Sequence, residues 1–310
     1  MNQTSRILEE VKKAVCGKDR VLVWVLTVLL ARGHVLLEDI PGVGKTTMAL
    51  AFSRALGLDY GRVQFTPDVL PSDITGYSVY QKESGKLVYQ PGAVLCNLFL
   101  ADELNRATSR TQSALLEAME EGQVTVDGEV HPLNAPFCVI ATQNQVGTAG
   151  TQPLPQAQMD RFLVQLTIGY PDFKSQVEIL RERQTQNPLD EVRQVSDRQA
   201  VLDMQRDVLA VTTSDALLEY ITRLAEASRE HPLLQLGISP RGALSVCRMA
   251  RAHAYLYGRD FVIVEDVQAV FSDVCAHRVL LSQRARMEKA SARQVMDGLL
   301  ADVPLPHAVR

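Results

Sequence analysis

The amino-acid sequence predicts an α/β domain over residues 1–170, with a parallel sheet covered by helices on both faces, and an all-helical domain over residues 171–310. In the first part, short apolar runs alternate with segments of helical spacing, a pattern typical of parallel strands joined by crossover helices. After residue 170 the strand-like runs disappear and amphipathic segments of helical spacing follow. A length of 310 residues also suits two domains rather than one.

The expected strands are apolar throughout, as strands buried on both faces are. They occupy residues 34–38, 62–65, 97–101, 137–141 and 163–168. Helices are expected over residues 46–56 and from Ser109 onward, where Gln112 completes a capping-box pattern. The apolar run over residues 21–31 is shorter than the roughly 20 residues of a membrane span, and it indicates a buried helix.

Two further segments alternate in polarity and predict β-hairpins inserted into the first domain. Residues 77–90 alternate around Gly85. Residues 123–133 contain Asp127-Gly128, the strongest short hairpin signal. Neither segment fits the regular alternation of strand and helix, so we expect both hairpins to project from the sheet domain.

Composition limits the classes of function. The net charge is −4 and the isoelectric point is near 5.9, which argues against binding nucleic acid by bulk attraction. The five cysteines form no C-x-x-C pair, so we expect buried, reduced thiols and no zinc site. The first residues do not resemble a signal peptide. Together these features predict a cytoplasmic protein without a membrane span.

The most informative segment is the loop at residues 39–46 (DIPGVGKT), which follows an expected strand and precedes an expected helix. This is the context of a phosphate-binding loop, G-x-x-x-x-G-K-[ST], although Asp39 replaces the first glycine. Lys45 would bind the β- and γ-phosphates of ATP, and the Thr46 hydroxyl would bind Mg²⁺. The candidate ligands of ATP or ADP in this loop are Pro41, Gly42, Val43, Gly44, Lys45, Thr46 and Thr47.

Two adjacent carboxylates, Asp102 and Glu103, follow the expected strand at residues 97–101. Asp102 would support the Mg²⁺, and Glu103 would polarise a water molecule aimed at the γ-phosphate. The alternative is a solvated turn at the end of a strand. The phosphate-binding loop favours the catalytic interpretation, because hydrolysis requires both tasks.

Three more polar residues are candidates from their type and place. Asn144 follows an expected strand, where its amide would orient the attacking water or simply form a turn. Arg161 and Arg241 each stand in a loop, where they would contact phosphate or lie on the surface. Spacing leaves both interpretations open for each of the three.

Taken together, six runs resemble a known family. They are residues 15–18 (VCGK), 38–46 (EDIPGVGKT), 101–107 (ADELNRA), 141–144 (ATQN), 153–162 (PLPQAQMDRF) and 237–241 (GISPR). Their joint order is similar to that of MoxR-type AAA+ ATPases of the helix-2-insert clade, over nearly the whole chain. The resemblance implies a P-loop AAA+ core and a helical lid.

The resemblance also implies roles for single residues. Asn144 matches the sensor-1 position, and Arg161 matches the arginine finger that acts across a subunit boundary. Arg241 matches sensor 2, which the lid would carry onto the γ-phosphate. Val15, Gly17 and Lys18 match the segment that meets the adenine, and the two hairpins match the helix-2 insert and the pre-sensor-1 insert.

At the level of biology, the resemblance implies a hexameric ring and a chaperone-like ATPase. Such a protein would assist maturation or metal-cofactor insertion of protein clients, together with a partner that carries a von Willebrand factor A domain. The sequence departs from the family at residues 145–152, which lack the usual acidic residues, and at Gln156, which replaces a glutamate. This loop is expected at the subunit boundary.

Three alternatives remain open. The altered loop suits a nucleotide-timed assembly scaffold with slow hydrolysis. A DNA-acting motor is disfavoured because the first hairpin offers only Lys82 and Lys86 against Glu83, and the second offers no lysine or arginine. A magnesium-chelatase-like subunit would share the fold and the inserts. Asn105 and Arg106, which follow the acidic pair, would either reach a neighbouring nucleotide or cap the next helix.

Overall fold

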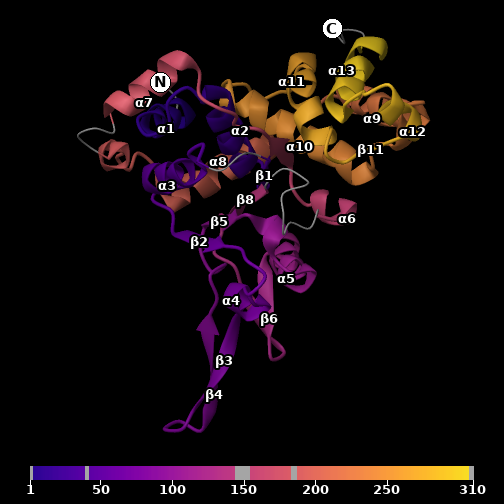
Figure 1. Ribbon diagram of the computed structural model, residues 1–310. Coiled ribbons are helices and arrows are strands. Elements are labelled where there is room, and N and C mark those ends of the chain that lie inside the picture. Colours follow the sequence, from indigo (N-terminus) through magenta and orange to yellow (C-terminus); the bar gives the residue numbers. More distant parts are fainter. Residues whose placement is uncertain (1–2, 39–41, 144–153, 183–186, 307–310) are drawn as a thin grey trace.

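The computed structural model describes residues 3–38, 42–143, 154–182 and 187–306. Within these residues, five strands form the central sheet, in the spatial order β2 (Tyr60–Gln64), β5 (Leu98–Asp102), β8 (Cys138–Gln143), β1 (Val35–Glu38) and β9 (Val164–Leu166) (Figure 1). Every neighbouring pair is parallel, which confirms the predicted parallel sheet. The carboxyl ends of all these strands therefore meet at one edge.

Helices cover both faces of the sheet. One face shares an apolar cluster with α2 (Asp19–Leu30) and α3 (Lys45–Leu56), on which α1 (Gln3–Lys12) packs, and the other face shares one with α5 (Ser109–Glu121). Successive side chains of a strand point to opposite faces, so Leu98 and Leu100 enter the first core while Phe99 and Ala101 enter the second. This double burial is the physical reason that the strands are apolar at every position.

The apolar run at residues 21–31 forms α2, whose side chains are buried over most of the helix, as the sequence predicted. None of the helices in the described ranges is both long enough and apolar enough to cross a membrane. The start of α5 differs from expectation. Its N-cap is Thr108, whose hydroxyl accepts from the Thr111 amide, whereas the Gln112 side chain turns inward and donates to the carbonyls of Leu104 and Ala107.

The structure has hairpins at both segments that alternate in polarity. The first comprises β3 (Gly76–Gln81) and β4 (Lys86–Pro91), follows the short helix α4 (Pro71–Thr75), and projects far from the body of the molecule (Figure 1). The second comprises β6 (Gln123–Val126) and β7 (Glu129–Pro132). The rings of Tyr89 and His131 stack with centroids 3.6 Å apart, so the bases of the two hairpins are in contact.

The part after residue 170 is mainly helical. It contains α7 (Phe173–Glu182), η2 (Pro188–Glu191), α8 (Arg198–Ala210), α9 (Asp215–Glu230), α10 (Pro240–Leu256), α11 (Val264–Cys275), α12 (Gln283–Met287) and α13 (Ala292–Asp302). A small antiparallel pair, β10 (Leu234–Leu236) with β11 (Leu280–Leu281), corrects the expectation of an all-helical part. These strands are too short to produce a recognisable alternation in the sequence.

The helical part shares a core with the sheet domain. α8 and α10 pack against α2, and α11 packs against β9. Buried side chains from both parts form one continuous apolar cluster, to which Leu26 of α2 and Met249 of α10 belong. Burial of apolar surface therefore holds the lid against α2 and β9 of the sheet domain.

A buried carboxylate, Asp266 of α11, organises the polar contacts inside the lid. Both of its oxygens accept from the Arg259 guanidinium, at 2.5 and 2.6 Å, and it also pairs with His253 Nδ1 at 2.6 Å and accepts from the Ile263 amide at 2.8 Å. Burial by itself would raise the pKa of Asp266, but the bonds from Arg259, His253 and Ile263 outweigh it and lower this pKa to about 2.

We predict that Asp266→Ala destabilises the protein by about 3 kcal/mol at pH 7, because Arg259, His253 and the Ile263 amide lose the buried carboxylate that they share. The folded pKa lies below the unfolded value of about 3.9. The stabilisation is therefore complete above that value and is lost as pH falls toward 2. Urea unfolding at pH 7 and pH 3 should show a smaller pH dependence in the variant. Asp203→Ala, which breaks an exposed pair with Arg206, is the matched control and should change stability little; equal losses in both variants would contradict the prediction.

Candidate functional site

The phosphate-binding loop joins the end of β1 to the start of α3. Gly42 and Gly44 adopt φ values of 84° and 92°, and Gly44 is the N-cap of α3. A Cβ atom at either glycine would meet no other atom within 4 Å, so the backbone conformation and not crowding demands glycine there. The curled backbone and the first turn of α3 present N–H groups where an anion is favoured. Pro41 lies outside the described residues.

A pocket of about 530 Å³ lies at this edge of the sheet. The structure brings most of the predicted nucleotide ligands to its wall, namely Val15, Lys18, Gly42, Val43, Gly44, Lys45, Thr46, Thr47, Asp102 and Glu103. We call this cavity the phosphate-loop pocket. Its size and its mixture of apolar and polar walls suit a small ligand with a charged end.

The acidic pair is fixed by Thr142, the penultimate residue of β8. Its hydroxyl donates to Asp102 Oδ1 at 2.8 Å and accepts from the Glu103 amide at 2.8 Å. Glu103 adopts a left-handed conformation, φ 57°, directly after the strand. This geometry is uncommon for a residue other than glycine, and it turns the chain sharply at the end of β5.

Each carboxylate of the pair is also bonded to an arginine. Asp102 accepts from Arg62 of β2 at 2.9 Å, and Glu103 pairs with Arg106 at 2.9 Å. Arg62 also lines the phosphate-loop pocket. Sequence reasoning missed both Arg62 and Thr142, because their approach to Asp102 depends on the order and register of the strands. Arg106 forms its ion pair with Glu103, three residues earlier in the chain. Its two expected roles, contact with a neighbouring nucleotide or capping of the next helix, stay predictions.

The donor set fits a magnesium ion bound together with a nucleotide. Thr46 and Asp102 both line the pocket and provide a hydroxyl and a carboxylate, and Mg²⁺ prefers such oxygen ligands. Among the described residues, no group of three or more histidine, cysteine or acidic side chains could hold a metal alone. An ion here would take its remaining ligands from phosphates and water, as Mg²⁺ in nucleotide sites does.

The opposite end of the pocket is built by the segment before α2 and the segment before α7. Val15 lines it together with Tyr170 and Pro171. Lys18 also lines the pocket, and its ammonium donates to the carbonyls of Ile168, Gly169 and Tyr170 at 2.8–3.0 Å; the expected adenine contact stays a prediction. These bonds tie the two segments together and close the back of the pocket.

Gly17 is required by space and by conformation. Its φ is +68°, and a Cβ atom there would lie 2.2 Å from Ser175 Oγ of α7. Gly17 does not belong to the described lining of the phosphate-loop pocket. The absence of a side chain at Gly17 lets α7 approach the segment that carries Val15, and the expected contact of Gly17 with a nucleotide stays a prediction.

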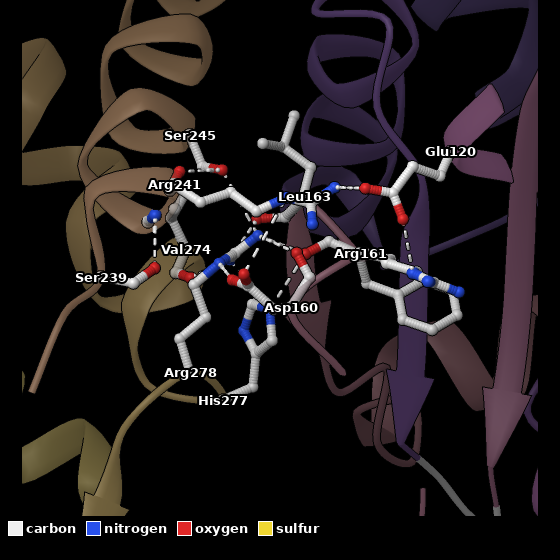
Figure 2. Close-up of polar contacts among 12 residues, drawn as sticks. Glu120, Asp160, Arg161, Leu163, Ser239, Arg241, Ser245, Val274, His277 and Arg278 are labelled. Atoms are coloured by element: carbon white, nitrogen blue, oxygen red, sulfur yellow. Dashed lines mark hydrogen bonds and ion pairs between the residues drawn. The ribbon is translucent and has the colours of Figure 1, made fainter. Parts of the chain in front are cut away.

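Arg161 and Arg241 lie in a second cavity, of about 360 Å³, on a different side of the sheet domain. Glu120 of α5 bridges them, with Oε2 2.9 Å from Arg161 and Oε1 2.8 Å from Arg241 (Figure 2). The described lining of the phosphate-loop pocket includes neither arginine. Arg241 therefore lies apart from the phosphate-loop pocket of its own chain, and its expected contact with a γ-phosphate stays a prediction.

The second cavity, which we call the arginine cavity, is strongly cationic. Its described lining contains five arginines, Arg32, Arg161, Arg241, Arg248 and Arg278, against two carboxylates, Glu120 and Asp160. Burial lowers the pKa of Arg248, and the nearby charges of Arg32 and Arg241 lower it further. Such an excess of positive charge favours binding of an anion that this chain does not itself supply.

Some expectations fall on residues that the structure does not describe. They are Asn144 and the altered loop at residues 145–152. Among the cysteines, Cys96, Cys138 and Cys275 are buried, and burial raises the pKa of each thiol to about 12. Cys16 and Cys247 are only partly buried, so the expectation of buried thiols holds for part of the set.

Comparisons with known proteins agree with this architecture. The family model "ATPase family associated with various cellular activities (AAA)" matches residues 34–164, and the "AAA lid domain" model matches residues 226–299. The solved structure of a putative ATPase from Cytophaga hutchinsonii superposes with a TM-score of 0.91 at 37% identity, covering 98% of this chain and 94% of that one.

Two curated relatives match over nearly the whole chain. The uncharacterized protein YeaC of Bacillus subtilis is 43% identical over 301 residues, which cover 97% of this chain and 94% of the relative. Chaperone MoxR1 of Mycobacterium tuberculosis is 37% identical over 310 residues, which cover 97% of this chain and 82% of the relative. On the strength of this shared length, the lid match and the phosphate-binding loop, the chain belongs to the MoxR family of AAA+ ATPases.

Proposed function

We propose that this protein binds ATP with Mg²⁺ in the phosphate-loop pocket and hydrolyses it. The observation that carries this proposal is the convergence of Lys45, Thr46 and the acidic pair on one pocket wall. Lys45 and the start of α3 bind the phosphates, and Thr46 and Asp102 hold the metal, which neutralises charge on the phosphoryl group. Glu103 accepts a proton from the attacking water.

The acidic pair is oriented before ATP arrives. The Thr142 hydroxyl fixes Asp102 Oδ1 and the Glu103 amide simultaneously, so the Asp102 carboxylate and the backbone at Glu103 need little rearrangement in the transition state. Asn144 directly follows β8, and we propose that its amide positions the same water. Pre-organisation of this kind lowers the barrier, because the orienting cost is met when the protein folds.

In a ring of subunits, the arginine cavity of one chain would meet the phosphate-loop pocket of the next chain. Arg161 and Arg241 are separated from the pocket of their own chain but are bridged to each other by Glu120. A neighbouring subunit that brings its γ-phosphate to this cavity would exchange the Glu120 carboxylate for a phosphate. We propose that both arginines act in this way on the next subunit of a ring, which the family resemblance suggests is a hexamer.

The two hairpins are the proposed contact with a protein client. The first exposes Tyr77, Val79, Tyr80 and Leu87, and the second exposes Val130. Exposed apolar side chains on a projecting element mark a surface that binds other proteins. The relative MoxR1 is described as a chaperone, and we propose a chaperone role here, in maturation or metal-cofactor insertion, with a partner that carries a von Willebrand factor A domain.

A nucleotide-timed scaffold with slow hydrolysis is a second candidate. It is favoured by the ion pairs that hold both carboxylates, Asp102 with Arg62 and Glu103 with Arg106. A carboxylate that is paired with an arginine must break that contact before it can bind the attacking water. Rapid basal turnover by the assembled protein alone would exclude this candidate.

We predict that Glu103→Gln retains ATP binding while hydrolysis falls by about 10²–10⁴-fold, because the general base is lost and the phosphate ligands remain. Lys45→Ala should lose ATP binding. Calorimetry with Mg-ATP and a phosphate-release assay measure the two properties separately. Unchanged affinity in Lys45→Ala, or unchanged turnover in Glu103→Gln, would refute the proposed site.

We predict that Arg161→Ala and Arg241→Ala each lower turnover by about 10³-fold or more, as loss of a trans-acting arginine does, with little change in ATP affinity. Subunits of Arg161→Ala and Lys45→Ala, both inactive alone, should regain activity when assembled together. The Lys45→Ala subunit then supplies its arginines to an intact neighbouring pocket. Absence of this recovery would contradict arginine action between subunits.

We predict that Tyr80→Ser combined with Leu87→Ser weakens the response to client protein. These residues are paired across β3 and β4 and both are exposed. A permanently unfolded protein should stimulate ATPase activity of the unaltered chain several-fold and of this variant much less, with equal basal rates. Gln81→Ser combined with Lys86→Ser, the adjacent polar pair, is the control; an equal loss in the control would argue against apolar recognition.

A further inference from the structure

Residues 160–163, which include Arg161, lie between α6 (Gln156–Met159) and β9. One buried side chain of the lid, that of Arg278, binds this segment. Arg278, which follows α11, has a side chain only 2% exposed. Its Nε donates to Asp160 Oδ1 at 2.7 Å, its Nη2 donates to the carbonyls of Asp160 and Phe162 at 3.1 and 2.6 Å, and its Nη1 donates to the Leu163 carbonyl at 3.1 Å (Figure 2). The segment is thus bonded on both sides of Arg161.

The same guanidinium reaches the helix that carries Arg241. Arg278 Nη2 lies 3.4 Å from Ser245 Oγ, and that hydroxyl donates to the Arg241 carbonyl at 2.9 Å. A Cβ atom at Gly242 would lie 3.3 Å from Arg278 Cδ. The absence of a side chain at Gly242 therefore lets the stem of Arg278 pass close beneath the first turn of α10.

The charge of Arg278 is balanced and its side chain is buried, as expected for a contact that persists. Asp160 supplies the counter-charge, and the remaining donors bond to backbone carbonyls, so the buried cation is well satisfied. Burial and the adjacent Arg278 charge lower the pKa of His277 well below its usual value. The neighbouring ring therefore stays neutral and adds no repulsion.

The ion pairs that Glu120 forms with Arg161 and Arg241 are more exposed than the contacts of Arg278. Its carboxylate is one-third exposed, and Arg161 and Arg241 are 27% and 49% exposed. Exposed ion pairs are weak and are readily exchanged for another anion. When a phosphate binds to both arginines, Glu120 no longer bridges them. Another contact must then keep the segment from the sheet domain aligned with α10 of the lid.

We propose that Arg278 is a positioning residue that fixes Arg161 and Arg241 relative to each other. The lid and residues 160–163 then present both arginines to the neighbouring nucleotide as one rigid unit; this rests on the proposed action between subunits. A planar guanidinium with several fixed donors can span these groups, whereas a lysine ammonium on a flexible stem cannot. The role is separate from binding the nucleotide of the same chain, because Arg278 lies outside the described lining of the phosphate-loop pocket.

The test uses Arg278→Lys in the full-length protein. We expect turnover of the assembled protein to fall about tenfold or more, and the affinity of its own pocket for Mg-ATP to stay within about twofold. Co-assembly with Lys45→Ala subunits, which keep intact arginines, should restore activity at the mixed boundaries. Co-assembly with Arg161→Ala subunits should not. The double variant Arg161→Ala, Arg278→Lys should lose less activity than the product of the two single losses, since part of the effect of Arg278→Lys acts through Arg161.

A purely structural role would impair ATP binding and would not be rescued by Lys45→Ala subunits, so either outcome overturns the proposal. Asp160→Asn, which removes the charge of the pair with little change in shape, should show the same rescue pattern with a smaller loss and guards against misfolding of Arg278→Lys. Arg259→Lys, at the Asp266 pair, alters another lid arginine and should leave turnover unchanged.

Two failures are distinguishable. If Arg161→Ala and Lys45→Ala subunits do not complement each other, the action between subunits is wrong and the role of Arg278 falls with it. If they complement each other while Arg278→Lys turns over at the normal rate, only the role of Arg278 is wrong.

Discussion

The parallel alignment of β1, β5 and β8 is the constraint on which the candidate site depends. It places the phosphate-binding loop, the acidic pair and Thr142 at one edge of the sheet, within the reach of one ligand. The hydroxyl of Thr142 then orients Asp102 and the start of the turn at Glu103 together. A shift of β8 by one residue would point Thr142 to the other face and separate these groups.

The molecule keeps its two sets of charged groups apart. Anion-binding amides and carboxylates meet in the phosphate-loop pocket, whereas an excess of guanidinium groups lines the arginine cavity. Neither set is complete for phosphoryl transfer, which needs a bound phosphate and cations around it. In the proposed ring, assembly of subunits would join the two sets and couple catalysis to the state of the ring. The buried Arg278 side chain bonds the lid to the segment that carries Arg161.

Much of the sheet domain could be predicted because strands buried on both faces leave a strong apolar signal. The phosphate-binding loop was also evident, since its glycines and Lys45 are adjacent in the chain. Thr142 and Arg62 were missed because they lie on other strands than Asp102, and only the folded sheet brings them into contact with it. The N-cap of α5 was misplaced by one residue, because Gln112 is drawn inward to two carbonyls that sequence spacing does not reveal.

The sequence by itself determined the fold class, the phosphate-binding loop, the acidic pair and the hairpins, because each depends on residues that are neighbours along the chain. Only the tertiary structure decided where Arg241 lies, that Lys18 closes the pocket through three carbonyls, and that Arg278 joins the lid to the segment of Arg161. These contacts join residues more than a hundred positions apart. Packing of the lid against the sheet domain creates the contacts of Arg241 and Arg278, and the path of the chain after β9 brings residues 168–170 to Lys18. No local pattern encodes either arrangement.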